Sequence, residues 1–414
     1  MAGAGIMSAR SRRASFGFIF ACSLVNSISF GLMIPVLPNL IKAFTGGDTA
    51  SASEWNVLFS VVWGVMQLFF GPLLGMLSDR VGRRPILLLS IFGLAVDFFL
   101  MAFAPSLMWL LAGRVLNGMT AASFSTANAY VADVTAPEER AKTFGMMGAS
   151  FSVGFICGPA IGGWLAGFDL RAPFLVAGAL CAINWLYGFF ILPESLPPER
   201  RTSRLDWGRA NPIGALGFLR SHNALLGLAG IGFLYQLAHT VLPSIFVLYS
   251  GYRYGWSAQT VGLTMLLTGI SGLAVQALLV GPVVSRLGER GTLLLGVACG
   301  AAGFLVYALA PTGWFYLLGI PVFAGINFVQ PGLQGLMTQR VSPQSQGQLQ
   351  GANQALQGVA SVLGPMIFGL TFAWSIREAA SFHAPGLAIG LASVMLVCAF
   401  GLALRFAQPR HLQG

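Results

Sequence analysis

The feature that most constrains this chain is a series of apolar stretches, each about 20 residues long, that recurs from one end to the other. A helix rises about 1.5 Å per residue, so each stretch is long enough to cross the roughly 30 Å hydrocarbon core of a bilayer. Strands of a membrane barrel are shorter, at about 10 residues, and alternate apolar with polar side chains. The chain is 56% hydrophobic and only 9% charged. Its mean hydropathy is +0.75, so we predict an all-α integral membrane protein.

We predict twelve transmembrane helices, at residues 16–41, 55–77, 85–105, 107–131, 144–166, 172–193, 223–248, 258–284, 291–310, 313–338, 350–374 and 384–406. Lys and Arg accumulate in the cytoplasmic connections of membrane proteins. Most of the 23 Lys and Arg residues fall on one side if the N-terminus is inside. This orientation predicts cytoplasmic N- and C-termini and accounts for the net charge of +10. It excludes a nucleic-acid partner, because no predicted soluble region is large enough to carry a basic face.

The two halves of the chain repeat each other. A constant shift of 206 positions superposes glycine, proline and arginine residues of the two halves, among them Gly75, Arg80, Gly82 and Arg84 on Gly281, Arg286, Gly288 and Arg290. We therefore predict two pseudo-symmetric six-helix bundles, 16–193 and 223–406. A flexible cytoplasmic linker, 194–222, is expected to join them, with an N-terminal arm at 1–15 and a tail at 407–414. A parallel duplication of six spans places a substrate site near the midplane between its halves.

Several motifs resemble those of one transporter family. "GMLSDRVGRR" between spans 2 and 3 is similar to the signature loop of the major facilitator superfamily (MFS), and "GPVVSRLGER" is its weaker counterpart in the second half. "GRVLNG" resembles the buried-arginine motif of this superfamily, and "GFICGPAIGG" resembles its antiporter motif. With "FGLMIPVLP", "APEERAKTFGMMGASF" and "QGQLQGANQALQGVASVLGP", the pattern is similar to the tetracycline-efflux type of drug:proton antiporter over nearly the whole chain. The resemblance implies alternating access in the inner (plasma) membrane.

The short connection between spans 2 and 3 carries four charged side chains. Gly75 would permit close helix approach, and Gly82 supplies a backbone geometry that residues with a Cβ resist. Asp79 could accept hydrogen bonds from Arg83 and from the start of span 11 near Gln350, where the helix dipole favours an anion. We predict a cytoplasmic latch, or gate, and Asp133 is placed to join it, as the resemblance also implies. Its predicted residues are Gly75, Asp79, Arg80, Gly82, Arg83, Arg84 and Asp133. Alternatively, the arginines only set the topology, which leaves Asp79 unexplained.

The predicted antiporter motif in span 5 contains glycines at intervals of four residues. Such a stripe lets another helix approach closely, and a proline removes one hydrogen bond and bends the helix. The motif residues are Gly154, Gly158, Pro159, Gly162 and Gly163. A generic packing interface is the alternative interpretation.

Two ionisable groups lie well inside predicted spans, Asp97 in span 3 and Arg114 in span 4. Both are roughly 10 to 12 Å from the outer ends of their helices, so they could pair. A carboxylate that alternates between arginine pairing and protonation could couple proton entry to a conformational change. A static structural pair is the alternative. His239 is a candidate second proton site or a hydrogen-bonded structural group.

Polar side chains occur at helical spacing on spans 1, 4, 7 and 10, which line the central cavity in the fold that the resemblance implies. The predicted cavity residues on these spans are Asn26, Ser29, Asn117, Asn128, Gln236, Asn327, Gln330 and Gln334. Gln67 and Gln276 match glutamines of the tetracycline-efflux pattern. Where that family carries further membrane acids, in spans 1 and 9, this chain has Asn26 and Gly300. Amides with few charges suit an amphipathic, neutral or weakly charged organic molecule.

No metal-ligand spacing, nucleotide-binding loop or nucleophile constellation occurs in the sequence. We expect no enzymatic activity, cofactor or metal, and the expected partners are a small-molecule substrate, protons and the lipid bilayer, with the protein acting as a monomer. The sequence thus predicts a secondary active efflux transporter that exchanges a drug-like molecule for protons. A uniporter or symporter of a small metabolite, and a membrane receptor that has lost transport, are the alternatives.

Overall fold

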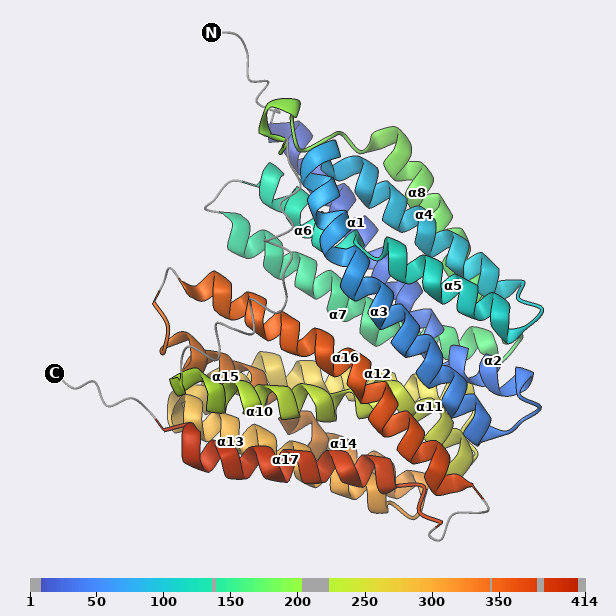
Figure 1. The fold of residues 1–414 in the computed structure, drawn as a ribbon, viewed down its shortest axis with the longest axis vertical. Helices are drawn as coiled ribbons and strands as arrows, with labels where there is room; N and C mark the ends of the chain where they lie inside the picture. Colours follow the sequence, from blue (N-terminus) through green and yellow to red (C-terminus); the bar gives the residue numbers. More distant parts are fainter. Residues whose placement is uncertain (1–8, 136–138, 203–222, 343–344, 378–382, 409–414) are drawn as a thin grey trace, which may run out of the picture. The chain divides into compact units, whose positions relative to one another are not determined.

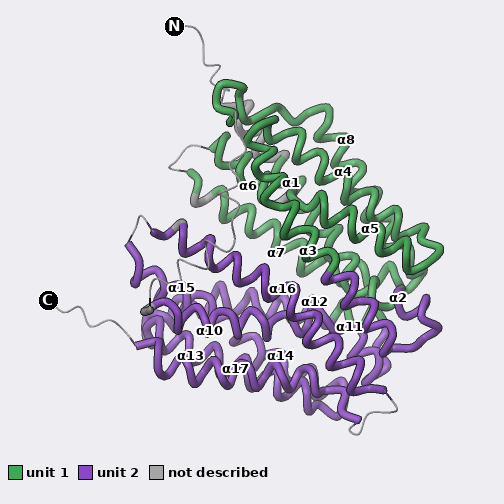
Figure 2. Tube along the Cα trace, viewed as in Figure 1, with its two compact units in different colours: residues 1–40, 62–210, 258–263 green, residues 41–61, 211–257, 264–414 purple. Residues whose placement is uncertain are grey.

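The computed structural model describes residues 9–135, 139–202, 223–342, 345–377 and 383–408, and every regular element in these ranges is helical (Figure 1). Residues 1–8 of the predicted arm, 203–222 of the predicted linker and 409–414 of the predicted tail lie outside them. The chain divides into two compact units (Figure 2). Unit 1 comprises residues 1–40, 62–210 and 258–263, and unit 2 comprises 41–61, 211–257 and 264–414.

Unit 1 is built mainly from the helices of the first half. These are α1 (Ala9–Met33), most of α3 (Thr49–Val81), α4 (Arg83–Ala102), α5 (Leu107–Thr120), α6 (Ser123–Val134), α7 (Arg140–Ala166) and α8 (Ala172–Ile191). The short helix α2 (Leu37–Phe44) and the start of α3 extend into unit 2.

Unit 2 is built mainly from the helices of the second half. These are α10 (Asn223–His239), α11 (Val241–Tyr254), most of α12 (Ala258–Ala274), α13 (Val280–Leu309), α14 (Gly313–Ala324), α15 (Val329–Thr338), α16 (Gln346–Ile376) and α17 (Leu387–Phe406). A π-helical turn, η4 (Val275–Leu279), joins α12 to α13, and a 3₁₀ turn, η5 (Gly325–Phe328), joins α14 to α15.

Helices pair in the same way in both units. In unit 1, α1 packs along α7 and α8, and α4 packs on α8, α5 and α6. In unit 2, α10 packs along α16 and α17, and α13 packs on α17, α14 and α15. The correspondence follows the 206-residue shift of the sequence repeat, so the repeat extends from motifs to helix packing.

Ten segments of the described chain are long and apolar enough to cross a membrane. Two local features explain why the structure has ten such segments where twelve spans were predicted. The helix predicted at 107–131 is broken at Ala121, where ψ is 64°, into α5 and α6. The spans predicted at 258–284 and 291–310 form one continuous segment of 52 residues. Within this segment the π-helical turn η4 joins α12 to α13, and Gly288 departs from helical geometry with a φ of 66°, a positive value that favours glycine.

The start of α3 is capped by Asp48, which lies in the loop after α2. Its carboxylate accepts the backbone N–H groups of Ala50, at 3.0 Å, and Ser51, at 3.2 Å. The hydrogen bond from the Ser51 hydroxyl lowers the pKa of Asp48 below its ordinary value. The cap therefore persists at neutral pH and is lost as the pH falls through that lowered pKa.

An apolar core at one end of unit 1 supports the site described below. It joins α1, α4, α6, α7 and the residue after α8, through Ile19, Cys22, Leu87, Ile91, Ala127, Tyr130, Val131, Met147 and Leu192. Tyr130 is fully buried, and its hydroxyl donates to the carbonyl of Pro193 at 2.9 Å. The core thus fixes the position at which the chain leaves α8.

Candidate functional site

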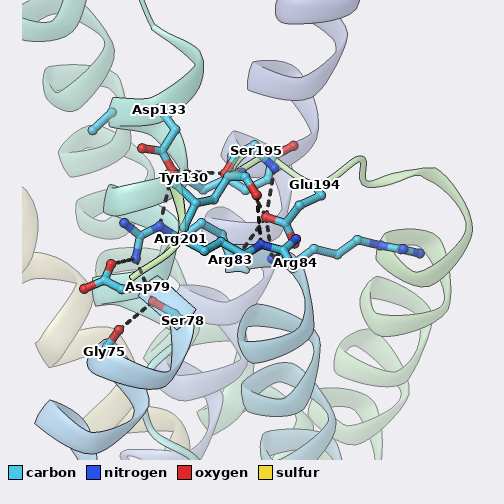
Figure 3. A network of polar contacts seen from close by, with 12 residues as sticks. Gly75, Ser78, Asp79, Arg83, Arg84, Tyr130, Asp133, Glu194, Ser195 and Arg201 are labelled. Atoms are coloured by element: carbon cyan, nitrogen blue, oxygen red, sulfur yellow. Dashed lines mark hydrogen bonds and ion pairs between the residues drawn. The ribbon is translucent and has the colours of Figure 1, made fainter. Parts of the chain in front are cut away.

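The loop between α3 and α4 consists of a single non-helical residue, Gly82. Its φ of 115° lies in the region that favours glycine, so the two helices can follow each other at once. A network of charged side chains gathers around this loop, and we call it the Arg83 cluster: Asp79 of α3, Arg83 of α4, Asp133 of α6 and Glu194 after α8 (Figure 3).

Arg83 is the centre of the cluster. Its guanidinium pairs with Asp79, one turn earlier on α3, and its Nε lies 3.2 Å from Asp133 Oδ2 on α6. Its Nη1 also donates to the hydroxyl of Ser78 at 2.7 Å. The Arg83 side chain is only 14% exposed, whereas that of Asp79 is 46% exposed. The largely buried guanidinium of Arg83, on α4, therefore links this helix to α3 and α6.

Glu194, three residues after α8, lies next to the first residues of α4 (Figure 3). Its Oε1 accepts the backbone N–H groups of Arg83 at 2.8 Å, and of Ser195 and Leu196 at 3.0 Å. A carboxylate at this position caps the helix and complements the positive end of its dipole. A Cβ at Gly82 would collide with this carboxylate, which is a second reason for glycine there.

Further contacts dock the chain after α8 onto the cluster. The Ser195 hydroxyl donates to Asp133 Oδ2 at 3.1 Å, and the Thr202 N–H donates to the Asp79 carbonyl at 3.0 Å. Arg84 points the other way and donates to the carbonyl of Phe189, in the last turn of α8, at 2.5 Å. The first residues of the predicted flexible linker are therefore ordered by specific hydrogen bonds.

Only some of the predicted gate residues lie close together in the structure. Arg83 contacts both Asp79 and Asp133, and Gly82 is the loop residue directly before Arg83. Arg80 is exposed, and a Cβ at Gly75 would meet no atom within 4 Å among the described residues. The sequence interpretation missed Glu194, Ser195, Ser78 and Tyr130. The available signal for Glu194 was its place directly after Pro193, where the longest polar connection begins.

A second polar feature lies inside unit 1, where Asp97 of α4 pairs with Arg114 of α5. The Asp97 side chain is 0% exposed and that of Arg114 is 6% exposed. Asp97 Oδ1 and Arg114 Nε have no hydrogen-bond partner among the described residues. Gly113 leaves room for the pair, because a Cβ there would lie only 2.5 Å from Asp97 Oδ1. The structure therefore brings together the two residues whose similar depth suggested a pair.

Three of the predicted cavity residues in unit 1 are buried. The Asn26 amide oxygen is 3.4 Å from Asn184 Nδ2 on α8, and Ser29 is fully buried. The Asn117 oxygen accepts the indole N–H of Trp63 at 2.7 Å. Because an indole N–H can only donate, this contact sets the amide orientation of Asn117.

The remaining predicted cavity residues are more accessible. Gln67, Gln236, Asn327 and Gln334 are half-buried, and Asn128, Gln276 and Gln330 are exposed. The His239 side chain is exposed at the end of α10, and its ring centre is 5.8 Å from that of Tyr235.

Three glycines of the predicted antiporter motif face α1, whereas a Cβ at the fourth, Gly163, would collide with the carbonyl oxygen of Ala258. A Cβ at Gly158 would lie 2.6 Å from Gly31 Cα, and one at Gly154 would lie 2.7 Å from the Ile28 nitrogen. Gly162 meets the Leu32 backbone in the same way. The stripe therefore brings α7 and α1 together backbone to backbone.

Comparison with known proteins identifies the family. The family model described as Major Facilitator Superfamily matches residues 19–365. The chain belongs to this superfamily. It is 37% identical to the class C tetracycline resistance protein of Escherichia coli over 375 residues, covering 90% of this chain and 92% of that protein. It is also 37% identical to the class G tetracycline resistance protein of Vibrio anguillarum over 349 residues, or 83% of this chain and 86% of that protein.

Among solved structures, the nucleoside transporter NupG superposes with a TM-score of 0.77 at 15% identity, over 95% of this chain and 99% of that one. This likeness concerns the fold alone. The predicted resemblance to tetracycline-efflux transporters of the MFS is confirmed by the relatives, and this MFS protein is a multi-pass protein of the inner membrane. Among the described residues, no group of three or more His, Cys, Asp or Glu side chains could hold a metal ion.

Proposed function

We propose that this MFS protein is a proton-driven antiporter that exports an amphipathic, drug-like molecule by alternating access. In this proposal the chain crosses the membrane twelve times, with both termini in the cytoplasm and residues 16–193 and 223–406 as its two moving bundles, and it acts as a monomer. The relatives named as tetracycline resistance proteins support drug export.

The observation that carries the proposal is the buried pair of Asp97 and Arg114. Charged groups inside a membrane are costly and are usually functional. Asp97 is fully buried, with one carboxylate oxygen on Arg114 and the other unpartnered among the described residues. Protonation of Asp97 would neutralise the carboxylate and release Arg114. The free energy of protonating Asp97 then differs between conformations that keep the pair and conformations that break it. This difference couples proton binding to the transport cycle.

The Arg83 cluster is proposed to act as the cytoplasmic gate. The Asp79 side chain is 46% exposed, against 14% for Arg83 and 24% for Asp133, so Asp79 is the more accessible carboxylate of the two that hold Arg83. The predicted partner is the start of α16. Arg83 and Asp133 would hold Asp79 in position while this contact forms and breaks.

The substrate is proposed to bind among the amides predicted to line the cavity, and the α7 glycine stripe is proposed to serve antiport. An amide donates and accepts hydrogen bonds without the desolvation cost of a charge, which suits a neutral or weakly charged ligand. His239 is retained as a candidate second proton site, because an imidazole can change its charge near neutral pH.

Inverted membrane vesicles with an imposed proton gradient test the antiport. Wild-type vesicles should accumulate a tetracycline or another candidate drug, and Asp97→Asn should abolish gradient-driven uptake while leaving substrate exchange intact. Asp169→Asn, in an exposed loop, is the matched control and should behave as the wild type. Gradient-driven uptake that survives in Asp97→Asn would contradict the assigned role of Asp97.

A uniporter or symporter of a metabolite is the second candidate, and one observation favours it. Gly300 occupies the span 9 position of a family acid, and a Cβ there would already lie 2.8 Å from Leu396 Cδ1 and 2.9 Å from Ile326 Cγ1. Glycine has no ionisable group, so this position cannot carry the proton that an acid there would bind. Wild-type flux that ignores the proton gradient would favour this candidate over antiport.

A further inference from the structure

The second repeat contains its own version of the central contact of the Arg83 cluster, with the donor and acceptor exchanged. The 206-residue shift places Arg83 on Glu289 and Asp133 on Gln339. In unit 1, Arg83 Nε donates to Asp133 Oδ2 at 3.2 Å. In unit 2, Gln339 Nε2 donates to Glu289 Oε1 at 3.0 Å. Each contact joins two residues that are 50 positions apart.

The backbone and the neighbouring arginine are equivalent in the two repeats. Gly82 and Gly288 both have positive φ, at 115° and 66°. Arg84 donates to the carbonyl of the third residue from the end of α8, and Arg290 donates to Leu404, the third residue from the end of α17, at 3.1 Å. The Glu289–Gln339 contact therefore occurs in a loop that is built like the one in unit 1.

The neighbouring charges differ in a consistent way. Two carboxylates, Asp79 and Asp133, surround the cation Arg83. Two neutral side chains, Ser285 and Gln339, occupy the corresponding positions around the anion Glu289, and the Ser285 hydroxyl donates to its own helix at Pro282. A carboxylate at position 339 would repel Glu289, whereas the amide binds it.

The packing around Glu289 also fits this side chain. A Cβ at Gly335 of α15 would lie 2.6 Å from Glu289 Cγ, and one at Gly332 would lie 2.8 Å from the Glu289 carbonyl oxygen. The corresponding residues of unit 1 are Ala129 and Thr126. Two glycines one turn apart thus leave room on α15 for the Glu289 side chain and backbone.

We propose that Glu289 and Gln339 form a second tether, which positions the loop of the second repeat as Arg83 and Asp133 position that of the first. The inference rests on the proposed transport function and adds positioning residues to it. Neither residue contacts the substrate in this proposal. The tether sets how fast the loop region moves through the cycle, so its loss lowers the maximal rate and leaves KM unchanged.

An isosteric exchange of the two side chains tests the tether in the full-length protein reconstituted into liposomes. Gln339→Glu places two carboxylates together and should lower the maximal transport rate about tenfold, with KM within about twofold of wild type. Adding Glu289→Gln restores one donor and one acceptor, so the double variant Glu289→Gln/Gln339→Glu should return to within about twofold of the wild-type rate. Ser285→Ala is the matched control and should not change the rate.

The pattern of rates decides the proposal. A wild-type rate in Gln339→Glu, or a double variant no faster than Gln339→Glu, would overturn the tether. Rates are measured both with a proton gradient and as substrate exchange without one. A wild type that exchanges substrate but ignores the gradient would refute antiport, and the exchange rates of the variants would still test the tether.

Discussion

Single side chains carry much of the organisation of the first repeat. Arg83 is held by carboxylates from two helices, while Glu194 binds the backbone of α4 from a position 111 residues later in the sequence. A carboxylate that caps a helix from another element ties that helix to a distant part of the chain. A movement of the α3–α4 loop relative to the chain that follows α8 must therefore break hydrogen bonds between them.

Removal of this cap should loosen the loop. Glu194→Ala leaves three partly buried N–H groups without their acceptor, and we expect the free energy of unfolding to fall by about 1–2 kcal/mol. Thermal unfolding in detergent measures the loss, and the transport rate should fall with it. Glu199→Ala, at an exposed position nearby, is the control. An unchanged unfolding temperature for Glu194→Ala would contradict the capping role.

At the scale of helices, close backbone contact decides which helices pair. Three α7 glycines of the motif, Gly154, Gly158 and Gly162, face α1 at Gly31 and its neighbours. A Cβ at Gly145 or Gly148 of the same helix would instead meet no atom within 4 Å among the described residues. The number of glycines in a helix therefore does not identify an interface. The interface is identified by the face of the helix on which the glycines lie.

Alanine substitutions on α7 separate these two kinds of glycine. Gly158→Ala puts a Cβ against backbone atoms of α1 that cannot move alone, and should destabilise the protein by about 1–3 kcal/mol. Gly148→Ala should be neutral or stabilising by up to about 1 kcal/mol, because alanine favours the helix. Unfolding in detergent compares the two variants. Equal stability of both would show that the α1–α7 contact is looser than the structure indicates.

At the scale of the whole molecule, the duplication organises both units. The same helix pairs recur in the two units, and Arg84 and Arg290, which are 206 residues apart, each donate to a carbonyl in the last turn of α8 or α17. The repeats differ in the charge of the residue after the loop glycine, which is Arg83 in the first repeat and Glu289 in the second. The two repeats therefore share the same arrangement of helices but differ in side-chain charge.

The predicted orientation follows from the distribution of basic residues and can be tested directly. In a variant whose five native cysteines are replaced, Ser285→Cys should react with a membrane-impermeant maleimide only in inverted vesicles. Asp169→Cys, in the loop between α7 and α8, should react only in intact cells or right-side-out vesicles. The opposite labelling pattern would reverse the predicted topology.

The sequence by itself determined the membrane-spanning helical class, the repeat and the family, because apolar length, charge bias and motif spacing are local or periodic properties. It also indicated Asp97 and Arg114 as a pair, since a buried charge needs a partner at similar depth. Only the tertiary structure decided that Glu194 caps α4, that the α7 glycines meet α1, and that Glu289 binds Gln339. These contacts join residues 50 or more positions apart, and their partners depend on how the helices pack, which no local pattern of residues specifies.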